Sequence, residues 1–394
     1  MNTRERPYMN RRARRTASGN RHRRVIVICA VGALLFGGVW LFTLKTPGAV
    51  SLSEAHEAET LEPEPTLTPE LTHTPELVLK STPEPAAVVI TVTAAGDCTL
   101  GGDTRNGTLA AFDRVWKSKG SEYFLKNLEP VFSADDITVV NLEGPLTTAD
   151  KHVQKKYAFK GRPEYAKILS AGGVDVCNLA NNHSEDYKAQ GTADTKAALE
   201  AEGIGYFGFS DTYLTTIKGV TVGFCGFFAR EADVNRVRET IRSLREECDV
   251  VIVSFHWGTE YKYTPDKACV ELGRLAIDEG ADLVLGHHTH VVGAVEQYKG
   301  KYIVYSLGNA CFGGNYGPDD SDTFLFQQSF ILEDGAVRDN GINIIPCRIS
   351  SSSYRNNYQP TLLNTKDGER VLKKITDAGK NLEGGVDFFL HREK

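Results

Sequence analysis

From Val88 onward, short apolar runs alternate with stretches whose apolar residues recur at helical spacing. Runs such as VVIT, ITVV, DVVIV and ADLVL are apolar throughout, which is typical of strands that are covered on both faces. We expect the intervening helices at Glu122–Phe132, Glu164–Ala171, Thr192–Glu202, Asp233–Glu247 and Lys267–Glu279. This alternation predicts βαβ units and a largely parallel sheet, and the strand-like segments near the C-terminus predict an antiparallel or second-sheet addition.

The sequence before this domain predicts a membrane anchor. Residues 1–24 hold nine Arg and one Glu and are expected to form a basic cytoplasmic tail. Residues 25–44, VIVICAVGALLFGGVWLFTL, carry no charge and are long enough to cross a hydrocarbon core of about 30 Å. The positive-inside bias then places the rest of the chain outside the cytoplasm. A cleaved signal peptide is the alternative, but TPGAVSLSEA is a poor cleavage site and the apolar core is long for a signal.

The remaining chain divides into a linker and a folded part. Residues 45–87 contain eight Glu and seven of the fifteen prolines, a composition that favours an extended extracytoplasmic stalk. Residues 88–350 are expected to form the domain, and residues 351–394 a C-terminal extension packed on it. Residues 88–394 carry about eight net negative charges, so they show no electrostatic footprint for nucleic acid.

Polar side chains that can bind a metal follow the ends of five predicted strands. Asp97 ends the first strand, in AAGDCTLGGD, and Glu143 ends the second, in NLEGP. The residues that follow the later strands are Asn181, Asn182 and His183, then His256, then His287, His288 and His290. Because ligands of open α/β sheets bind at the carboxyl ends of strands, these five segments are expected to converge on one site.

The residue types in these segments are compatible with zinc, manganese or iron, which bind imidazole, carboxylate and amide oxygen. Two such ions about 4 Å apart, sharing a carboxylate, form a clamp for displacement at phosphorus. Each segment also has an ordinary interpretation: a hydrogen-bonded structural histidine at His256, a surface turn at Glu143, or helix-capping asparagines in NNH. The GHHTH segment is the hardest to explain by packing. There is no GxSxG motif and no Walker A motif, so hydrolase-elbow and P-loop chemistry are excluded.

Six motifs, in order, resemble those of the CapA family of poly-γ-glutamate capsule proteins. They are AAGDCTLGGD, VVNLEGPLT, NLANNHSEDY, VSFHWGTEY, GHHTHVVGAVE and YSLGNACFGG, and the resemblance covers roughly residues 89–332. That family is related in fold to calcineurin-like metallophosphoesterases. The resemblance therefore implies an α/β fold of the four-layer αββα sandwich type, preceded by one transmembrane helix.

The resemblance also implies roles for individual residues. Asp97 would be the first-strand ligand, Glu143 the bridging carboxylate and His183 the catalytic residue that assists the leaving group. The other metal ligands would be Asn182, His256, His288 and His290. The residues expected to line a substrate-binding mouth are Asn181, His287, Ser306 and Asn309. Metallophosphoesterases carry a histidine where this chain has Thr99, so one metal position loses a ligand and the centre is expected to hold one or two divalent ions (Mn, Zn or Fe).

The function implied by the resemblance is synthesis or export of poly-γ-glutamate or a related capsule polymer at the cell membrane. The expected partners are membrane subunits of the polymer synthase, and the expected substrate is the anionic polymer or a phosphorylated envelope intermediate. Two alternatives remain open: an extracytoplasmic metallophosphoesterase without a capsule role, and a non-catalytic assembly subunit. The basic cluster nearest to the site motifs is Lys155, Lys156, Lys160 and Arg162.

Overall fold

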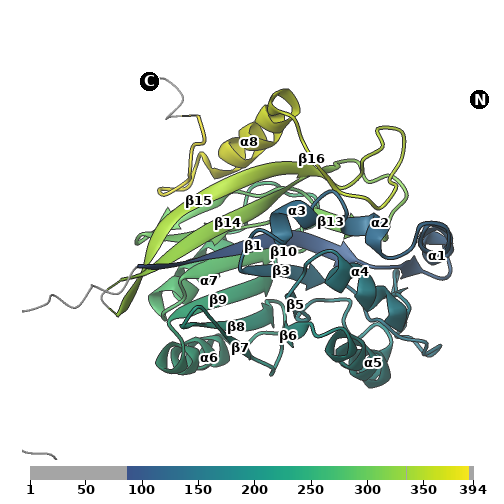
Figure 1. Cartoon of the computed structure of the whole chain (residues 1–394), viewed down its shortest axis with the longest axis horizontal. Coiled ribbons are helices and arrows are strands. Elements are labelled where there is room, and N and C mark those ends of the chain that lie inside the picture. The colour runs from purple at the N-terminus through teal and green to yellow at the C-terminus, as the bar shows by residue number, and fades with distance from the viewer. Residues whose placement is uncertain (1–86, 334, 390–394) are drawn as a thin grey trace, which may run out of the picture. The chain divides into compact units, whose positions relative to one another are not determined.

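The computed structural model of the chain describes residues 87–333 and 335–389 (Figure 1). The predicted cytoplasmic tail and membrane anchor, and all but the last residue of the predicted stalk, lie outside these residues. Within the described part of the chain, no helix has the length and apolar character that a bilayer crossing requires.

Eight strands form the larger sheet, in the order β16-β15-β14-β1-β3-β5-β6, with β13 beside the end of β1. Four of them are parallel to one another: β1 (Val88–Thr99), β3 (Ile137–Leu142), β5 (Val176–Asn178) and β6 (Gly205–Phe207). On the other side of β1 the sheet continues with antiparallel strands, β14 (Asp322–Glu333), β15 (Ala336–Arg348) and β16 (Thr361–Leu362). The short strand β13 (Asn309–Phe312) runs parallel to β1 and pairs Asn309 with Asp97.

Six strands form the smaller sheet, in the order β11-β12-β10-β9-β8-β7. Its parallel strands are β8 (Val220–Phe228), β9 (Val250–His256), β10 (Leu283–His287) and β12 (Lys301–Val304). The antiparallel strands β7 (Tyr213–Ile217) and β11 (Val295–Tyr298) form its two edges. A separate two-stranded ribbon pairs β2 (Gly102–Asp103) with β4 (Phe159–Lys160).

The helices follow the sequence predictions in part. α6 (Val234–Glu247) and α7 (Lys267–Asp278) agree within one residue, and α4 (Ala166–Ala171) follows a short 3₁₀ turn at Pro163–Tyr165. α5 (Lys188–Ala201) begins four residues before its prediction.

The single helix predicted at Glu122–Phe132 is wrong. The structure has two short helices there, α2 (Glu122–Leu125) and α3 (Glu129–Phe132). Pro130 lacks a backbone N–H and clashes with a preceding turn, so it starts a new helix rather than continuing the first. Two further helices were not predicted: α1 (Thr108–Lys119) and α8 (Thr365–Gly379).

The two sheets pack face to face, and helices cover their outer faces (Figure 1). Side chains such as Val92 and Val139 from the larger sheet meet Val222 and Ile252 from the smaller one in a shared core. The outer face of the larger sheet packs on α1, α2, α4 and α5, and that of the smaller sheet on α6 and α7. Helix α8 lies along β15 and adds Ile375 to the core between the sheets. Because both faces of each sheet are covered, the central strands have no polar face, as their sequences indicated.

Candidate metal centre

The predicted ligand residues meet at one rim, where the carboxyl ends of β1, β3 and β5 come close to those of β9 and β10. Asp97 lies near the end of β1, where its N–H donates to Gly308 O across 2.9 Å. A Cβ on the preceding residue, Gly96, would lie 2.1 Å from Gly308 O, so this approach requires glycine. Glu143 follows β3 and is completely buried. The rim therefore collects side chains from both sheets.

The first group of possible metal ligands contains Glu143, His256 and His288, whose ligand atoms lie within 4.8 Å of one another. His256 Nε2 lies 3.0 Å from His288 Nδ1 and 3.7 Å from Glu143 Oε1. Asn182 joins this group, because its Oδ1 lies 2.7 Å from the same His256 nitrogen. Imidazole nitrogen, carboxylate oxygen and amide oxygen from four segments of the chain thus lie close enough together to share one metal ion.

The second group contains Asp97, Glu143 and His290, again with ligand atoms within 4.8 Å of one another. His290 Nδ1 lies 3.5 Å from Asp97 Oδ2, and His290 Nε2 lies 3.8 Å from Glu143 Oε1. Glu143 belongs to both groups, so its carboxylate stands where a bridge between two cations would stand. Thr99, the position at which the resemblance implied a missing histidine ligand, donates through its Oγ1 to Glu143 Oε2 at 3.0 Å.

Divalent cations fit this donor set. Glu143 Oε1 has no hydrogen-bond partner among the described residues, although the side chain is completely buried. An unpartnered buried carboxylate oxygen is costly, and a bound cation would provide the missing interaction. Imidazole nitrogen with carboxylate and amide oxygen suits zinc, manganese or iron.

Burial controls the protonation of the first group. It lowers the pKa of His256 well below its usual range, and it lowers the pKa of His288 to about 4, with further lowering from His290 and Arg230. Both imidazoles are therefore neutral near pH 7, as ligation requires. Burial raises the pKa of Glu143, and this effect outweighs the opposing charges of the neighbouring histidines.

In the second group, neighbouring charges rather than burial set the direction of the pKa shifts. Burial alone would raise the pKa of Asp97, but the contact with His287 and the charges of nearby histidines lower it overall. Burial alone would lower the pKa of His290, but the carboxylates of Glu143 and Asp97 raise it overall.

The GHHTH turn holds two of the histidines in an uncommon backbone conformation. His288 has a φ of +92° and His290 a φ of +59°, both in the left-handed region that non-glycine residues rarely occupy. Such positions cost about 1–3 kcal/mol each and persist where surrounding contacts over-determine them. Here His288 N–H donates to Asp97 Oδ2 at 3.2 Å, and Thr289 O accepts from Tyr261 N–H at 2.7 Å. The strained turn directs both rings into the rim.

His183, the predicted catalytic residue, is oriented by a carboxylate. Its Nδ1 lies 2.7 Å from Asp186 Oδ2, and its ring stacks on Phe159 with centroids 4.2 Å apart. Asp186 is itself held by an ion pair with Lys155 and by the N–H of Phe159, which donates at 2.6 Å. These contacts leave Nε2 as the free ring nitrogen of His183.

The four residues predicted to bind substrate all lie at the rim and are all buried. Asn181 donates to Leu142 O at 2.9 Å and accepts from His183 N–H at 3.0 Å. Asn309 Oδ1 accepts a hydrogen bond from His290 Nδ1 at 2.9 Å, and Ser306 Oγ donates to Val291 O at 2.8 Å. His287 Nδ1 lies 3.3 Å from Asp97 Oδ1. Asn181, Ser306 and Asn309 thus hydrogen-bond to protein groups at the rim, whereas neither ring nitrogen of His287 has a hydrogen-bond partner among the described residues.

Sequence analysis did not single out two residues of the rim, Asn141 and Asn178, which are completely buried. Asn141 Nδ2 donates to Asp97 Oδ1 at 2.8 Å and lies 3.4 Å from His256 Nδ1, while its Oδ1 accepts from Asn178 Nδ2 at 2.9 Å. The available signal was an asparagine within each apolar strand, in VVNLEG and VCNLANN. Asp186 was also overlooked, although it follows His183 by three positions.

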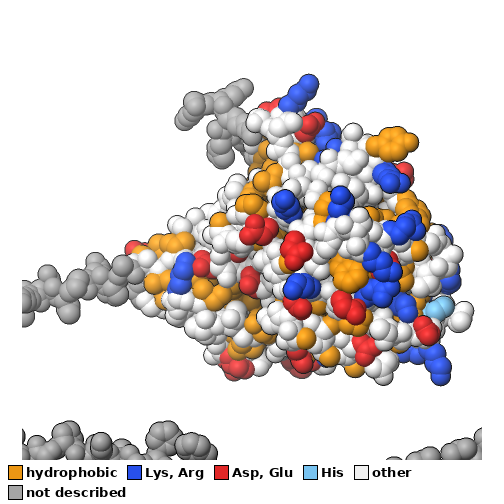
Figure 2. Space-filling view, turned by 45° about the vertical axis from the view of Figure 1, so that its right-hand side comes forward, with side chains coloured by type: hydrophobic (Ala, Val, Ile, Leu, Met, Phe, Trp, Pro, Cys, Tyr) orange, Lys and Arg blue, Asp and Glu red, His pale blue; other side chains and the backbone are white. Residues whose placement is uncertain are grey.

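The basic cluster predicted near the site is largely paired within the protein. Lys155 contacts Asp186, Lys160 Nζ donates to Ala149 O at 2.6 Å, and Arg162 pairs with Asp113. Lys156 lies over the ring of Tyr157, 4.9 Å from its centroid. Figure 2 shows Lys and Arg side chains gathered on the right-hand part of one face, with acidic side chains between them.

Comparison with solved structures shows a similarity to the calcineurin-like phosphoesterase YfkN from Bacillus subtilis. The alignment has a TM-score of 0.41 and 16% sequence identity, and it covers 75% of this chain and 98% of that one.

Sequence comparison shows closer relationships. The chain is 34% identical over 226 residues to the PGA biosynthesis protein CapA of Bacillus subtilis, covering 51% of this chain and 59% of that protein. It is 26% identical over 320 residues to the capsule biosynthesis protein CapA of Bacillus anthracis, covering 73% of each. A probable polyglutamine synthesis accessory protein of Mycobacterium tuberculosis is 30% identical over 211 residues, covering 45% of this chain and 56% of that protein.

The sequence profile of one family matches residues 91–314, more than half of the chain and the whole of the rim described above. That family is described as the bacterial capsule synthesis protein PGA_cap. The resemblance to capsule proteins in the motifs is therefore confirmed: this chain belongs to the PGA_cap family of bacterial capsule synthesis proteins.

Proposed function

We propose that this chain is a membrane-anchored, extracytoplasmic protein of poly-γ-glutamate or related capsule synthesis, with a two-metal centre that acts on a phosphate ester. The carrying observation is the buried carboxylate of Glu143, which belongs to both ligand groups and has an oxygen without a hydrogen-bond partner in the described part of the chain. Family membership supports the capsule role, and the apolar segment at residues 25–44 supports the anchor.

Different residues of the rim would bind the metal ions and transfer the proton in such a reaction. When bound, divalent cations would supply positive charge that stabilises negative charge developing on phosphoryl oxygens. His256, His288 and Asn182 would hold one position, and Asp97 and His290 the other, with Glu143 between them. His183, oriented by Asp186, can carry a proton on Nε2 and deliver it to the leaving oxygen.

Metal content and hydrolysis of the full-length chain in nanodiscs test the centre. After equilibration with Mn²⁺ or Zn²⁺, we expect up to two ions per chain and hydrolysis of bis(p-nitrophenyl) phosphate. Asp97→Asn should lose about one ion per chain, whereas Glu143→Gln should reduce binding at both positions, since only Glu143 belongs to both groups. Glu239→Gln, at an exposed position of α6, serves as the matched control.

A chain that binds no divalent ion at micromolar concentrations contradicts the metal centre. The capsule role is tested separately in a poly-γ-glutamate-producing host from which the gene has been deleted. We expect polymer yield to return with the wild-type chain and with Glu239→Gln, and to stay low with Glu143→Gln. Full restoration by Glu143→Gln contradicts a role for the centre in polymer production.

A further inference from the structure

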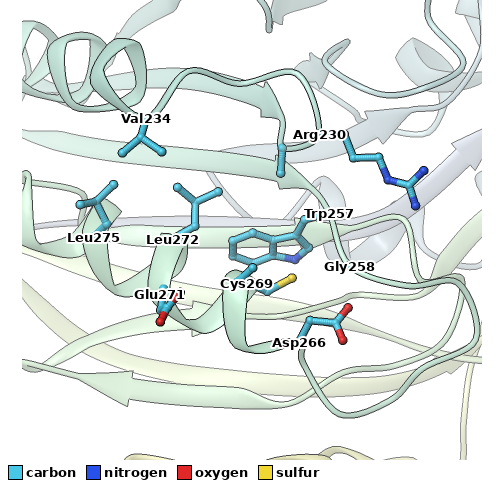
Figure 3. A pocket seen from close by; sticks show the side chains of 11 residues that line it. Arg230, Val234, Trp257, Gly258, Asp266, Cys269, Glu271, Leu272 and Leu275 are labelled. Carbon is cyan, nitrogen blue, oxygen red and sulfur yellow. The ribbon is translucent and has the colours of Figure 1, made fainter.

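A cavity of about 510 Å³ lies on the outer face of the smaller sheet, between the segment that follows β8 and helix α7 (Figure 3). Most of its lining is apolar, with Trp257 at the centre of the view and Val234, Leu272 and Leu275 toward one end. A cavity of about 150 Å³ is enough to bind benzene. This one is larger but partly open to solvent, so it can hold an alkyl chain along its apolar wall.

The Trp257 side chain is held in place by ring stacking and by a hydrogen bond. Its indole stacks with Phe255 and with Tyr305, with centroids 4.7 Å and 5.8 Å away, and its Nε1 donates to Tyr305 O at 2.8 Å. A preformed apolar wall lowers the entropic cost of binding an apolar group.

Two of the three charged side chains that line the cavity are paired within the protein, and the third is a cation. Asp266 accepts hydrogen bonds from Lys262 and Thr259, and Glu271 pairs with Lys267 at 3.2 Å. The third charged residue of the lining, Arg230, is exposed and forms no hydrogen bond or ion pair with the part of the chain that the structure describes. The cavity therefore complements a ligand that is apolar along its length and negatively charged at one end.

The cationic end of the cavity lies toward the metal centre. Figure 3 shows Arg230 at the end of the cavity opposite Leu275. Trp257 directly follows the candidate ligand His256, whose carbonyl accepts from the N–H of Ala229 at 3.1 Å. Arg230 directly follows Ala229 in the chain. Cavity and centre thus adjoin across the end of β9.

We propose that the substrate of this centre is an amphiphilic phosphate ester, whose apolar chain occupies the Trp257 cavity while its phosphate lies between Arg230 and the metal ligands. The inference rests on the proposed function, because it names the substrate class of the same centre. A polymer of carboxylates alone would leave this apolar wall without a partner.

Calorimetric binding of n-alkyl phosphates, from methyl to octyl, to the full-length chain in nanodiscs tests the inference, with empty nanodiscs as the blank. Burying each added methylene is expected to raise affinity up to about fourfold, which corresponds to about 0.8 kcal/mol. Ala268→Phe, at an exposed lining position of α7, should fill the cavity and flatten this dependence. Ala197→Phe, at an exposed position of α5, should leave it unchanged.

A second pair of variants separates charge from chain length. Arg230→Gln should weaken binding of every alkyl phosphate by a similar factor of several-fold and keep the chain-length dependence, whereas Arg114→Gln on α1 should change neither. Affinity that is independent of chain length in the wild type, or that rises equally in Ala268→Phe, overturns the inference. Failure of the proposed metal centre is detected by a different measurement, as the absence of bound metal or of hydrolysis. The dependence of affinity on chain length is measured from binding alone.

Discussion

Thr99 Oγ1 donates a hydrogen bond to Glu143 Oε2 across 3.0 Å, and both side chains are buried. This contact links the end of β1 to the carboxylate that belongs to both ligand groups. The threonine hydroxyl belongs to neither ligand group. Instead, it orients the carboxylate that the two ligand groups share, so that Oε1 points toward His256 and His290.

Replacing Thr99 by valine removes this hydrogen bond and keeps the shape of the side chain. Loss of a partner that orients a metal ligand commonly lowers metal affinity by 10–100-fold. We therefore expect Thr99→Val to weaken Mn²⁺ binding by about 10-fold or more, measured by calorimetric titration, while Thr99→Ser retains near wild-type affinity. Equal affinities for valine and wild type contradict this role of the hydroxyl.

The His183–Asp186 pair predicts a non-additive loss of activity. Asp186→Asn should lower kcat for a phosphodiester about 100-fold or more, because the imidazole loses the carboxylate that orients it. His183→Ala should lower kcat at least as much. The double variant should be no slower than His183→Ala alone, since both residues act through one ring.

Metal content separates this role from a structural one. Asp186 belongs to neither ligand group, so Asp186→Asn should bind the same number of ions as the wild type. Glu185→Gln, an exposed neighbour, is the control for the turn. Independent, multiplicative losses in the double variant contradict the proposed coupling.

The positions of the rim residues could be predicted because strand ends are readable in the sequence. An apolar run followed by Asp97, Glu143 or GHHTH marks the carboxyl end of a buried strand, and parallel strands bring such ends to one edge. The family resemblance implied only that Glu143 would bridge two ions, and the division of the other ligands into two groups comes from the structure.

Other features depended on contacts that no local pattern specifies. Asn141 looks unremarkable within VVNLEG, and its importance comes from partners in β1, β5 and β9. Helix α8 was missed although Val371, Leu372 and Ile375 follow helical spacing behind the capping residue Asn364; only its place in the core depends on strands that come before it in the chain. The break between α2 and α3 was readable from Pro130.

The buried network of Asn141 predicts a large effect on stability. Asn141→Leu keeps the branched skeleton of the side chain but leaves Asp97 Oδ1 and Asn178 Nδ2 without this partner, and each unsatisfied buried group costs about 1–3 kcal/mol. We expect the free energy of unfolding in urea to fall by about 3 kcal/mol. The matched change Asn343→Leu, at an exposed position of β15, should alter it by less than about 0.5 kcal/mol. A loss below 1 kcal/mol in Asn141→Leu contradicts the network's contribution.

Asp135, which precedes β3, lies at the opposite end of the strands from the metal rim. Burial raises the pKa of its carboxyl to about 6, and the charges of Asp175 and Asp136 add to this effect against hydrogen bonds from Thr93 and Thr138. The folded state therefore binds a proton here more tightly than the unfolded chain, whose Asp pKa is near 3.9. The stabilisation from that proton is fully present below about pH 4 and is lost as the pH rises through 6.

Asp135→Asn should remove this pH-dependent loss. A shift of about two pKa units corresponds to about 3 kcal/mol, which we reduce to about 1 kcal/mol because the side chain is only partly buried. The variant should gain about 1 kcal/mol of unfolding free energy relative to wild type at pH 7.5, and little or none at pH 4. Urea unfolding at both pH values measures this difference, with Asp319→Asn in the exposed loop before β14 as control. A gain that is the same at both pH values would show that the proton on Asp135 does not link folding to pH.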